Sequence, residues 1–158
     1  MERDTEKLEL EFRSLVRKDK TLLSDFLKWL TPQAYETWHH YGGAFDQKLA
    51  SKILMSNEVK IIGIDKKNKR IIVLGHLYSF SEKTCRLGIV SGITGKGYGT
   101  LMMGVLLEEA RKRGVESIYL STNKENLAAV KLYLRFGFKT VKEYSDRPEK
   151  VLEMEKVF

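Results

Sequence analysis

Hydrophobic and polar positions along this chain switch between the period of β-strands and the period of α-helices. Apolar runs typical of strands are found at residues 8–16, 59–65, 70–80, 84–90, 117–121, 138–144 and 151–158. Apolar spacing of three and four residues, together with capping signals, predicts helices at residues 20–30, 31–43, 46–56, 101–113 and 126–136. This order of elements predicts a mixed α/β (α+β) fold, which we expect to form one domain over residues 1–158.

Three of these strands, between residues 59 and 90, follow one another closely. The segments that separate them, 66–69 and 81–83, are too short for crossover helices, so the strands should be antiparallel neighbours. The run Ile71–Leu74 is apolar without alternation, which predicts burial on both faces of the sheet.

The composition indicates a folded protein with a basic, solvated surface. Of the 158 residues, 42% are hydrophobic, yet no apolar run approaches the ~20 residues of a membrane helix. The N-terminal residues are charged and lack the apolar core of a secretion signal. The one cysteine, Cys85, excludes an internal disulfide. We therefore expect a cytoplasmic protein with no membrane partner.

The formal net charge of +7 comes from charges of both signs that interleave along the chain. The one dense basic run, Lys66–Arg70, lies between two predicted strands. We interpret this run as a hairpin turn and expect no nucleic-acid partner.

A glycine-rich segment lies between a predicted strand and a predicted helix. Glycine alternates with other residues at Gly95, Gly97 and Gly99, which lets the backbone approach a ligand closely and leaves N–H groups accessible. The helix that follows adds unpaired amides and the positive end of its dipole. This combination predicts an anion site, most often for phosphate.

A second motif follows downstream and consists of Asn126, Ala129, Tyr133, Gly137 and Phe138. Together with Gly97 and Gly99 it resembles the GNAT superfamily, the acyl-coenzyme A dependent N-acyltransferases. The signature of that family is Gln/Arg-x-x-Gly-x-Gly/Ala at a helix start, then an Asn-x-x-Ala-x-x-x-Tyr helix that ends in Gly-Phe. The resemblance extends over residues 70–158.

The resemblance implies the GNAT fold, a mixed and mostly antiparallel sheet flanked by helices, with a splayed pair of strands that binds acyl-CoA. It implies an N-acetyltransferase that uses acetyl-CoA as cosubstrate and an amine as acceptor, with no metal. The amine attacks the thioester directly within a ternary complex.

The family's functional positions carry over to this sequence. Those implied to bind the cofactor are Leu87, Gly88, Ile89, Thr94, Gly95, Lys96, Gly97, Tyr98, Gly99, Thr100 and Asn126. Tyr133 corresponds to the general acid that protonates the departing thiolate. Read from the residues alone, Asn126 is equally a helix N-cap and Tyr133 a packed aromatic residue.

Two positions depart from the family's pattern. Thr94 stands where the signature has Gln or Arg, so the backbone and Lys96 must hold more of the pyrophosphate. Ser121 stands where the similar ribosomal-protein acetyltransferases carry a glutamate base. The sequence therefore does not identify a general base.

The candidate bases are His76 and His39, followed by His40, Glu36 and Glu82. His76 is equally a satisfied core histidine, and no base is needed if a water relays the proton. Cys85 is disfavoured as a nucleophile because no partner for it is visible.

Two alternatives to a small-molecule acetyltransferase stay open. The acceptor is either a small amine or a protein amine, at an N-terminus or a lysine, and an overall basic chain disfavours polycationic acceptors. A non-catalytic CoA-binding sensor or interaction module is the second alternative. The protein is expected to be a monomer or a homodimer.

Overall fold

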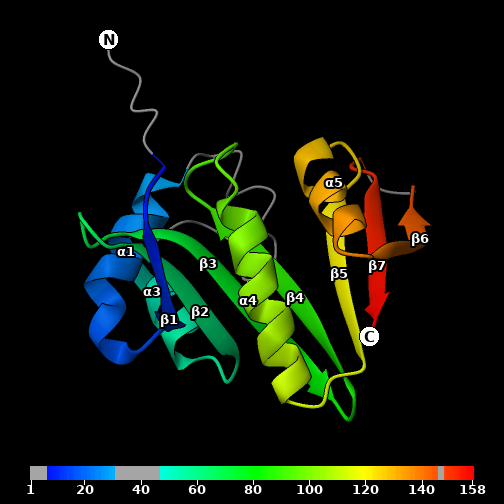
Figure 1. Ribbon diagram of the computed structural model, residues 1–158, viewed down its shortest axis with the longest axis horizontal. Helices are drawn as coiled ribbons and strands as arrows, with labels where there is room; N and C mark the ends of the chain where they lie inside the picture. Colours follow the sequence, from blue (N-terminus) through cyan, green and yellow to red (C-terminus); the bar gives the residue numbers. More distant parts are fainter. Residues whose placement is uncertain (1–6, 31–46, 146–147) are drawn as a thin grey trace.

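A seven-stranded sheet organises the molecule, with helices on both of its faces (Figure 1). The structure is a computed structural model that describes residues 7–30, 47–145 and 148–158. Its strands are β1 (Leu10–Ser14), β2 (Val59–Asp65), β3 (Ile71–Ser81), β4 (Thr84–Ser91), β5 (Ser117–Asn123), β6 (Lys139–Tyr144) and β7 (Val151–Val157). Its helices are the 3-10 turn η1 (Arg17–Asp19), α1 (Lys20–Trp29), α3 (Gln47–Met55), α4 (Tyr98–Lys112) and α5 (Leu127–Arg135).

The strand order is β1-β2-β3-β4-β5-β7-β6. Neighbours are antiparallel except β4 and β5, which are parallel. The predicted antiparallel run β2-β3-β4 and the mixed, mostly antiparallel sheet are therefore confirmed. The basic run after β2 is the predicted hairpin turn, in which the Asp65 carboxylate accepts hydrogen bonds from the Lys67 amide and the Asn68 side chain.

Each face of the sheet carries its own hydrophobic core. Helices α4 and α5 pack on one face around Met102, Leu106 and Phe138, whereas α1 and α3 pack on the other around Phe26 and Ile53. Strand β3 contributes to both cores. This confirms burial on both of its faces.

The parallel pair β4 and β5 is joined over a short length only. Thr84, Cys85 and Arg86 pair with Ser117, Ile118 and Tyr119, and the register ends there. Beyond Arg86 the two strands separate towards the end of the sheet where the glycine-rich loop precedes α4 (Figure 1). The splayed pair implied by the resemblance is therefore present.

The element boundaries differ from the sequence predictions by a few residues. The first strand is shorter than predicted, and β5 continues two residues beyond Ser121 to Asn123. Asp19 precedes α1, but its carboxylate accepts bonds from Arg13 and the Val16 amide instead of capping the helix. The helix predicted at 31–43 lies outside the described residues. No described helix has the length and apolar character required to cross a membrane.

Candidate active site

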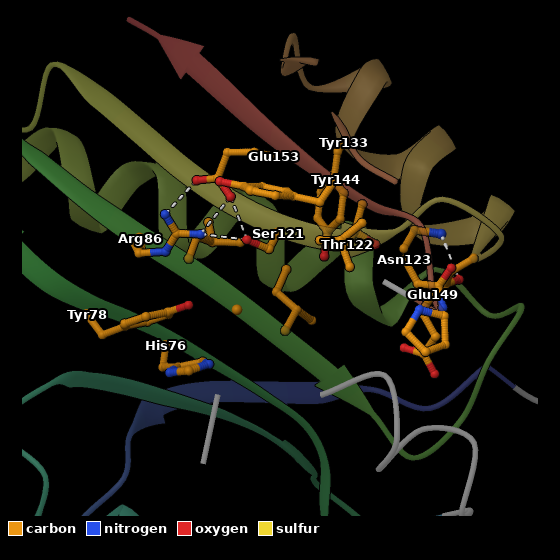
Figure 2. Close-up of a pocket in the computed structure, with 17 residues that line it drawn as sticks. His76, Tyr78, Arg86, Ser121, Thr122, Asn123, Tyr133, Tyr144, Glu149 and Glu153 are labelled. Atoms are coloured by element: carbon orange, nitrogen blue, oxygen red, sulfur yellow. Dashed lines mark hydrogen bonds and ion pairs between the residues drawn. The ribbon is translucent and has the colours of Figure 1, made fainter. Parts of the chain in front are cut away.

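A cleft of about 920 Å³ opens where β4 and β5 separate (Figure 2). Residues of β3, β4, β5, α5 and the ends of β6 and β7 line it. The lining comes from strands on both sides of the split and from α5. A ligand in it would contact backbone edges as well as side chains.

The predicted cofactor residues Leu87, Gly88 and Ile89 form the β4 wall of this cleft. On one side they pair with β3, at Leu77, His76 and Gly75. Pairing with β5 has already ended at Arg86, so the other edge of this segment faces the cleft without a strand partner in the described chain. An extended ligand can add to such an edge like another strand.

Tyr133 reaches the cleft from α5 on the opposite side from His76 and Tyr78 (Figure 2). Its side chain is 8% exposed, and its ring packs at 5.8 Å from the ring of Phe138. Burial, with a smaller contribution from Tyr78, raises the pKa of Tyr133 to about 12. The phenol therefore keeps its proton throughout the neutral range, as a general acid requires.

Asn126 stands at the N-terminus of α5 and lines the cleft. Its side-chain oxygen accepts a hydrogen bond of 3.3 Å from the Ala129 amide, so the N-cap role read from the sequence is present. The side-chain NH₂ group of a capping asparagine can still donate to a ligand. Thr122 and Asn123 also line the cleft, and they were missed because the sequence predicted β5 to end at Ser121.

The glycine-rich loop lies directly after β4, at the open end of the splay (Figure 1). Gly95 and Gly97 have φ angles of 73° and 83°, in the left-handed region that favours glycine. A Cβ atom on either residue would have no protein atom within 4 Å. The space above both residues is therefore open to a ligand.

The side chain of Tyr98 points away from that space. It is 1% exposed, lies in the core, and accepts a hydrogen bond of 2.8 Å from the Leu8 amide. Tyr98 can therefore contribute only its backbone N–H to an anion. Arg135 of α5, which the sequence did not single out, donates to the Thr100 hydroxyl at 3.2 Å and places a guanidinium beside the first turn of α4.

Arg86, Ser121 and Glu153 form a network on the wall of the cleft (Figure 2). Arg86 contacts the Glu153 carboxylate through both terminal nitrogens, at 2.6 and 3.1 Å. Ser121 accepts from Arg86 at 2.7 Å and donates to Glu153 at 2.6 Å. Burial acts to raise the pKa of Glu153, but these hydrogen bonds and the Arg86 charge hold it below its usual value.

This network clamps β4 to β7 across β5, so the Glu153→Gln variant should lose about 2 kcal/mol of unfolding free energy at neutral pH. Because the pKa of Glu153 is lowered by folding, its stabilisation is complete above pH 4.5. It is lost as the pH falls through the folded-state value. Urea unfolding at pH 7 and pH 3 measures both differences, and the difference at pH 3 should be the smaller.

Glu143→Gln is the matched control. Glu143 lies on β6 and forms an exposed ion pair with Lys124, at 2.8 Å. Solvent screens such an exposed pair, so its loss should cost much less stability than loss of the clamp. Equal losses for the two variants at pH 7 would contradict a stabilising role for the clamp.

Of the candidate general bases, only some lie within the described residues. His76 lies on β3 and lines the cleft, whereas His39, His40 and Glu36 lie outside the described residues. Glu82 occupies the β3–β4 turn and does not belong to the cleft lining. Cys85 is buried, and burial raises its pKa to about 11, which disfavours the thiolate.

Comparison with known proteins identifies the family of this chain. The model of the Acetyltransferase (GNAT) family matches residues 23–138. The uncharacterized N-acetyltransferase YobR of Bacillus subtilis (strain 168) is 47% identical over 53 residues, or 34% of this chain. The matched segment spans 22% of the length of that relative.

Solved structures share the fold over nearly the whole chain. A GNAT-family acetyltransferase from Streptococcus pneumoniae is 22% identical, with a TM-score of 0.75 over 95% of this chain and 100% of the other. Spermidine N-acetyltransferase from Vibrio cholerae, in complex with CoA and spermine, is 22% identical. Its TM-score is 0.76 over 94% of this chain and 95% of the other. Ribosomal-protein-S5-alanine acetyltransferase from Vibrio fischeri is 12% identical. Its TM-score is 0.80 over 98% of this chain and 94% of the other.

Proposed function

Because this chain belongs to the acetyltransferase (GNAT) family, whose members are N-acetyltransferases, we propose that it transfers the acetyl group of acetyl-CoA to an amine. The amine attacks the thioester directly while both substrates are bound. The observation that carries this proposal is the cleft between β4 and β5, which joins an unpaired strand edge to a buried, protonated tyrosine.

The residues present fit coenzyme A. The unpaired edge of Leu87, Gly88 and Ile89 is suited to the amide-containing pantetheine arm. The open space above Gly95 and Gly97 is suited to the pyrophosphate. Thr94 offers the phosphates a hydroxyl and no charge, so Lys96 of the same loop supplies the cation in this proposal, with Arg135 beside Thr100 as a second source.

The proposed reaction uses two groups of the cleft. A backbone N–H near Ile89 polarises the thioester carbonyl and stabilises the oxyanion that forms when the amine attacks. The C–S bond then breaks, and Tyr133 gives its proton to the departing sulfur.

A screen of CoA release tests the proposal. Acetyl-CoA is presented with polyamines, because one structural neighbour is a spermidine acetyltransferase. It is also presented with peptides bearing free N-termini, because another acetylates ribosomal protein S5, and with lysine peptides and small primary amines. We expect at least one class to release CoA in proportion to the amide formed. Tight CoA binding without turnover on any amine would instead indicate a CoA-binding module.

A further inference from the structure

His76 is held between a carboxylate and the cleft. Its ring is 1% exposed, and its Nδ1 lies 3.4 Å from Oε2 of Glu58, whose side chain is 14% exposed. A carboxylate only accepts hydrogen bonds, so Nδ1 carries the proton in the neutral ring. The lone pair is then on Nε2, the nitrogen directed away from Glu58.

That nitrogen points at a gap in β4. Gly88 pairs with His76 across the sheet, and a Cβ atom on Gly88 would lie 2.1 Å from His76 Nε2. Only glycine at position 88 therefore leaves the imidazole in its place. Both residues line the cleft, so Nε2 occupies the position from which a side chain of β4 would otherwise face the substrate.

A stacked tyrosine also holds the His76 ring in this orientation. Tyr78 stacks on His76 with ring centroids 4.8 Å apart and an interplanar angle of 16°. The stack and the Glu58 contact together restrict rotation of the imidazole. A base that is already oriented loses less entropy when the substrate arrives.

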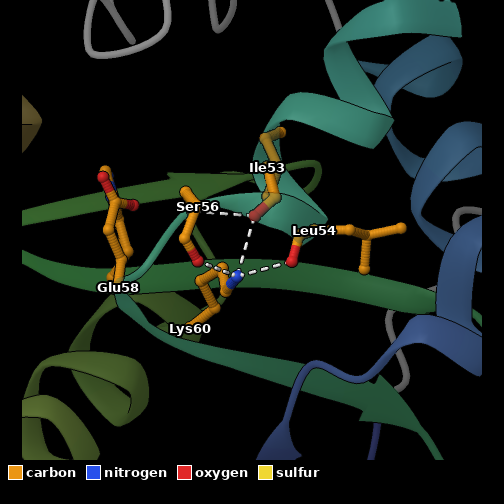
Figure 3. Close-up of polar contacts among 6 residues, drawn as sticks. Ile53, Leu54, Ser56, Glu58 and Lys60 are labelled. Atoms are coloured by element: carbon orange, nitrogen blue, oxygen red, sulfur yellow. Dashed lines mark hydrogen bonds and ion pairs between the residues drawn. The ribbon is translucent and has the colours of Figure 1, made fainter.

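A cation of β2 also lies beside this pair, and Glu58 interacts with it electrostatically. Lys60 lies opposite His76 on β2, but its ammonium group donates to the carbonyls of Ile53, Leu54 and Ser56, at 2.8, 3.0 and 2.8 Å (Figure 3). Lys60 therefore caps the C-terminus of α3.

Arg86 is another charged neighbour on this face and lies opposite Tyr78. Arg86 is paired with Glu153. Glu153 in turn accepts bonds from Arg86 and Ser121, and its lowered pKa makes it a poor proton acceptor. Glu149 also lines the cleft, but the Glu58–His76 pair joins an oriented ring nitrogen to a carboxylate that stabilises its charged form, which suits the pair to accept a proton.

We propose that His76 is the general base of the acetyl transfer and that Glu58 is the residue that positions and charges it. This proposal rests on the acetyltransferase function proposed above. An amine acceptor arrives as an ammonium ion, which has no lone pair. His76 Nε2 takes one proton from it, directly or through one water, and Glu58 stabilises the imidazolium that results.

The protons and bonds balance around this step. The neutral amine forms the C–N bond, the C–S bond breaks, and the sulfur leaves with the proton of Tyr133. The amide nitrogen returns its extra proton to the Tyr133 oxygen. His76 releases the proton of the original ammonium to solvent, so one proton is produced for each amide formed.

The state of the pair can be tested without turnover. The chain has 3 histidines, so ¹⁵N imidazole signals can be assigned by single substitution and followed against pH. We expect the Nδ1–H tautomer for His76. We also expect Glu58→Gln to move the midpoint of its titration down by about one pH unit, because the neighbouring charge is lost. An Nε2–H tautomer, or an unmoved midpoint, would overturn the pairing.

Turnover separates a positioning role from a structural one. His76→Gln should lower kcat/KM about 100-fold and abolish the acidic limb of its pH profile. Glu58→Gln should shift that limb to lower pH, and Glu58→Asp should restore part of the rate. Glu109→Gln, which removes a carboxylate paired with Arg113 on α4, should change neither.

The outcomes distinguish the two proposals. A wild-type protein that acetylates no amine contradicts the proposed function, while the imidazole signals still report on the Glu58–His76 pair. An active enzyme whose acidic limb is the same in wild type, His76→Gln and Glu58→Gln contradicts the assignment of the base.

Discussion

Tyr133→Phe should lower kcat about 100-fold and leave the Kd for acetyl-CoA unchanged. The substitution removes only the hydroxyl, and the ring can keep its packing against Phe138. Without a donor, the sulfur must leave as an unprotonated thiolate, and a 100-fold loss corresponds to about 2.7 kcal/mol of transition-state stabilisation. CoA release measures kcat and calorimetry measures the Kd.

The raised pKa adds a pH dependence to this expectation. Since burial raises the pKa of Tyr133 to about 12, the phenol should stay protonated at every pH from 6 to 10. The wild-type rate should therefore show no basic limb from Tyr133 in that range. A basic limb below pH 10 that disappears in Tyr133→Phe would mean that the occupied cleft stabilises the phenolate.

Tyr119→Phe is the matched control. Tyr119 lies on β5 outside the cleft, and its hydroxyl donates to Glu155 at 2.9 Å. Loss of this hydrogen bond should lower stability slightly and leave kcat unchanged. Equal kcat values for wild type and Tyr133→Phe would remove Tyr133 as the acid.

Local pattern was sufficient for much of the fold but not for the order of its last strands. The antiparallel run β2-β3-β4 follows from its short connections, and burial of Ile71–Leu74 on both faces follows from its continuous apolar character. Nothing in the periodicity shows that β7, not β6, lies next to β5. Strand order depends on contacts between distant segments, so Glu153 beside Ser121 could not be predicted.

Some residues of the candidate site could likewise be predicted from the sequence, and others could not. Gly97, Asn126 and Tyr133 could be placed because their spacing follows a motif. Glu58 gives no such signal, since it precedes a strand and reads as an ordinary surface residue until β2 pairs with β3. The direction of the Tyr98 side chain was equally hidden, because a glycine-rich segment does not reveal which face of the next helix is buried.

Gly97→Val should abolish measurable CoA binding while the protein still folds. Gly97 caps α4 with a φ of 83°, which a β-branched residue adopts only at a cost of about 1–2 kcal/mol. The valine side chain would also fill the open space above the loop and screen the amides at the start of α4 from an anion. Calorimetry with CoA measures the binding, and circular dichroism with urea unfolding measures the fold.

Gly114→Val separates backbone strain from loss of the ligand site. Gly114 follows α4 at its other end, with a φ of 74° and no protein atom within 4 Å of an added Cβ. Both variants should therefore lose similar stability, because each forces valine into the left-handed region. Only Gly97→Val should lose CoA binding, since only Gly97 lies at the open end of the splayed strands. Retained affinity in Gly97→Val, or equal losses in both variants, would contradict the assignment of this loop to the pyrophosphate.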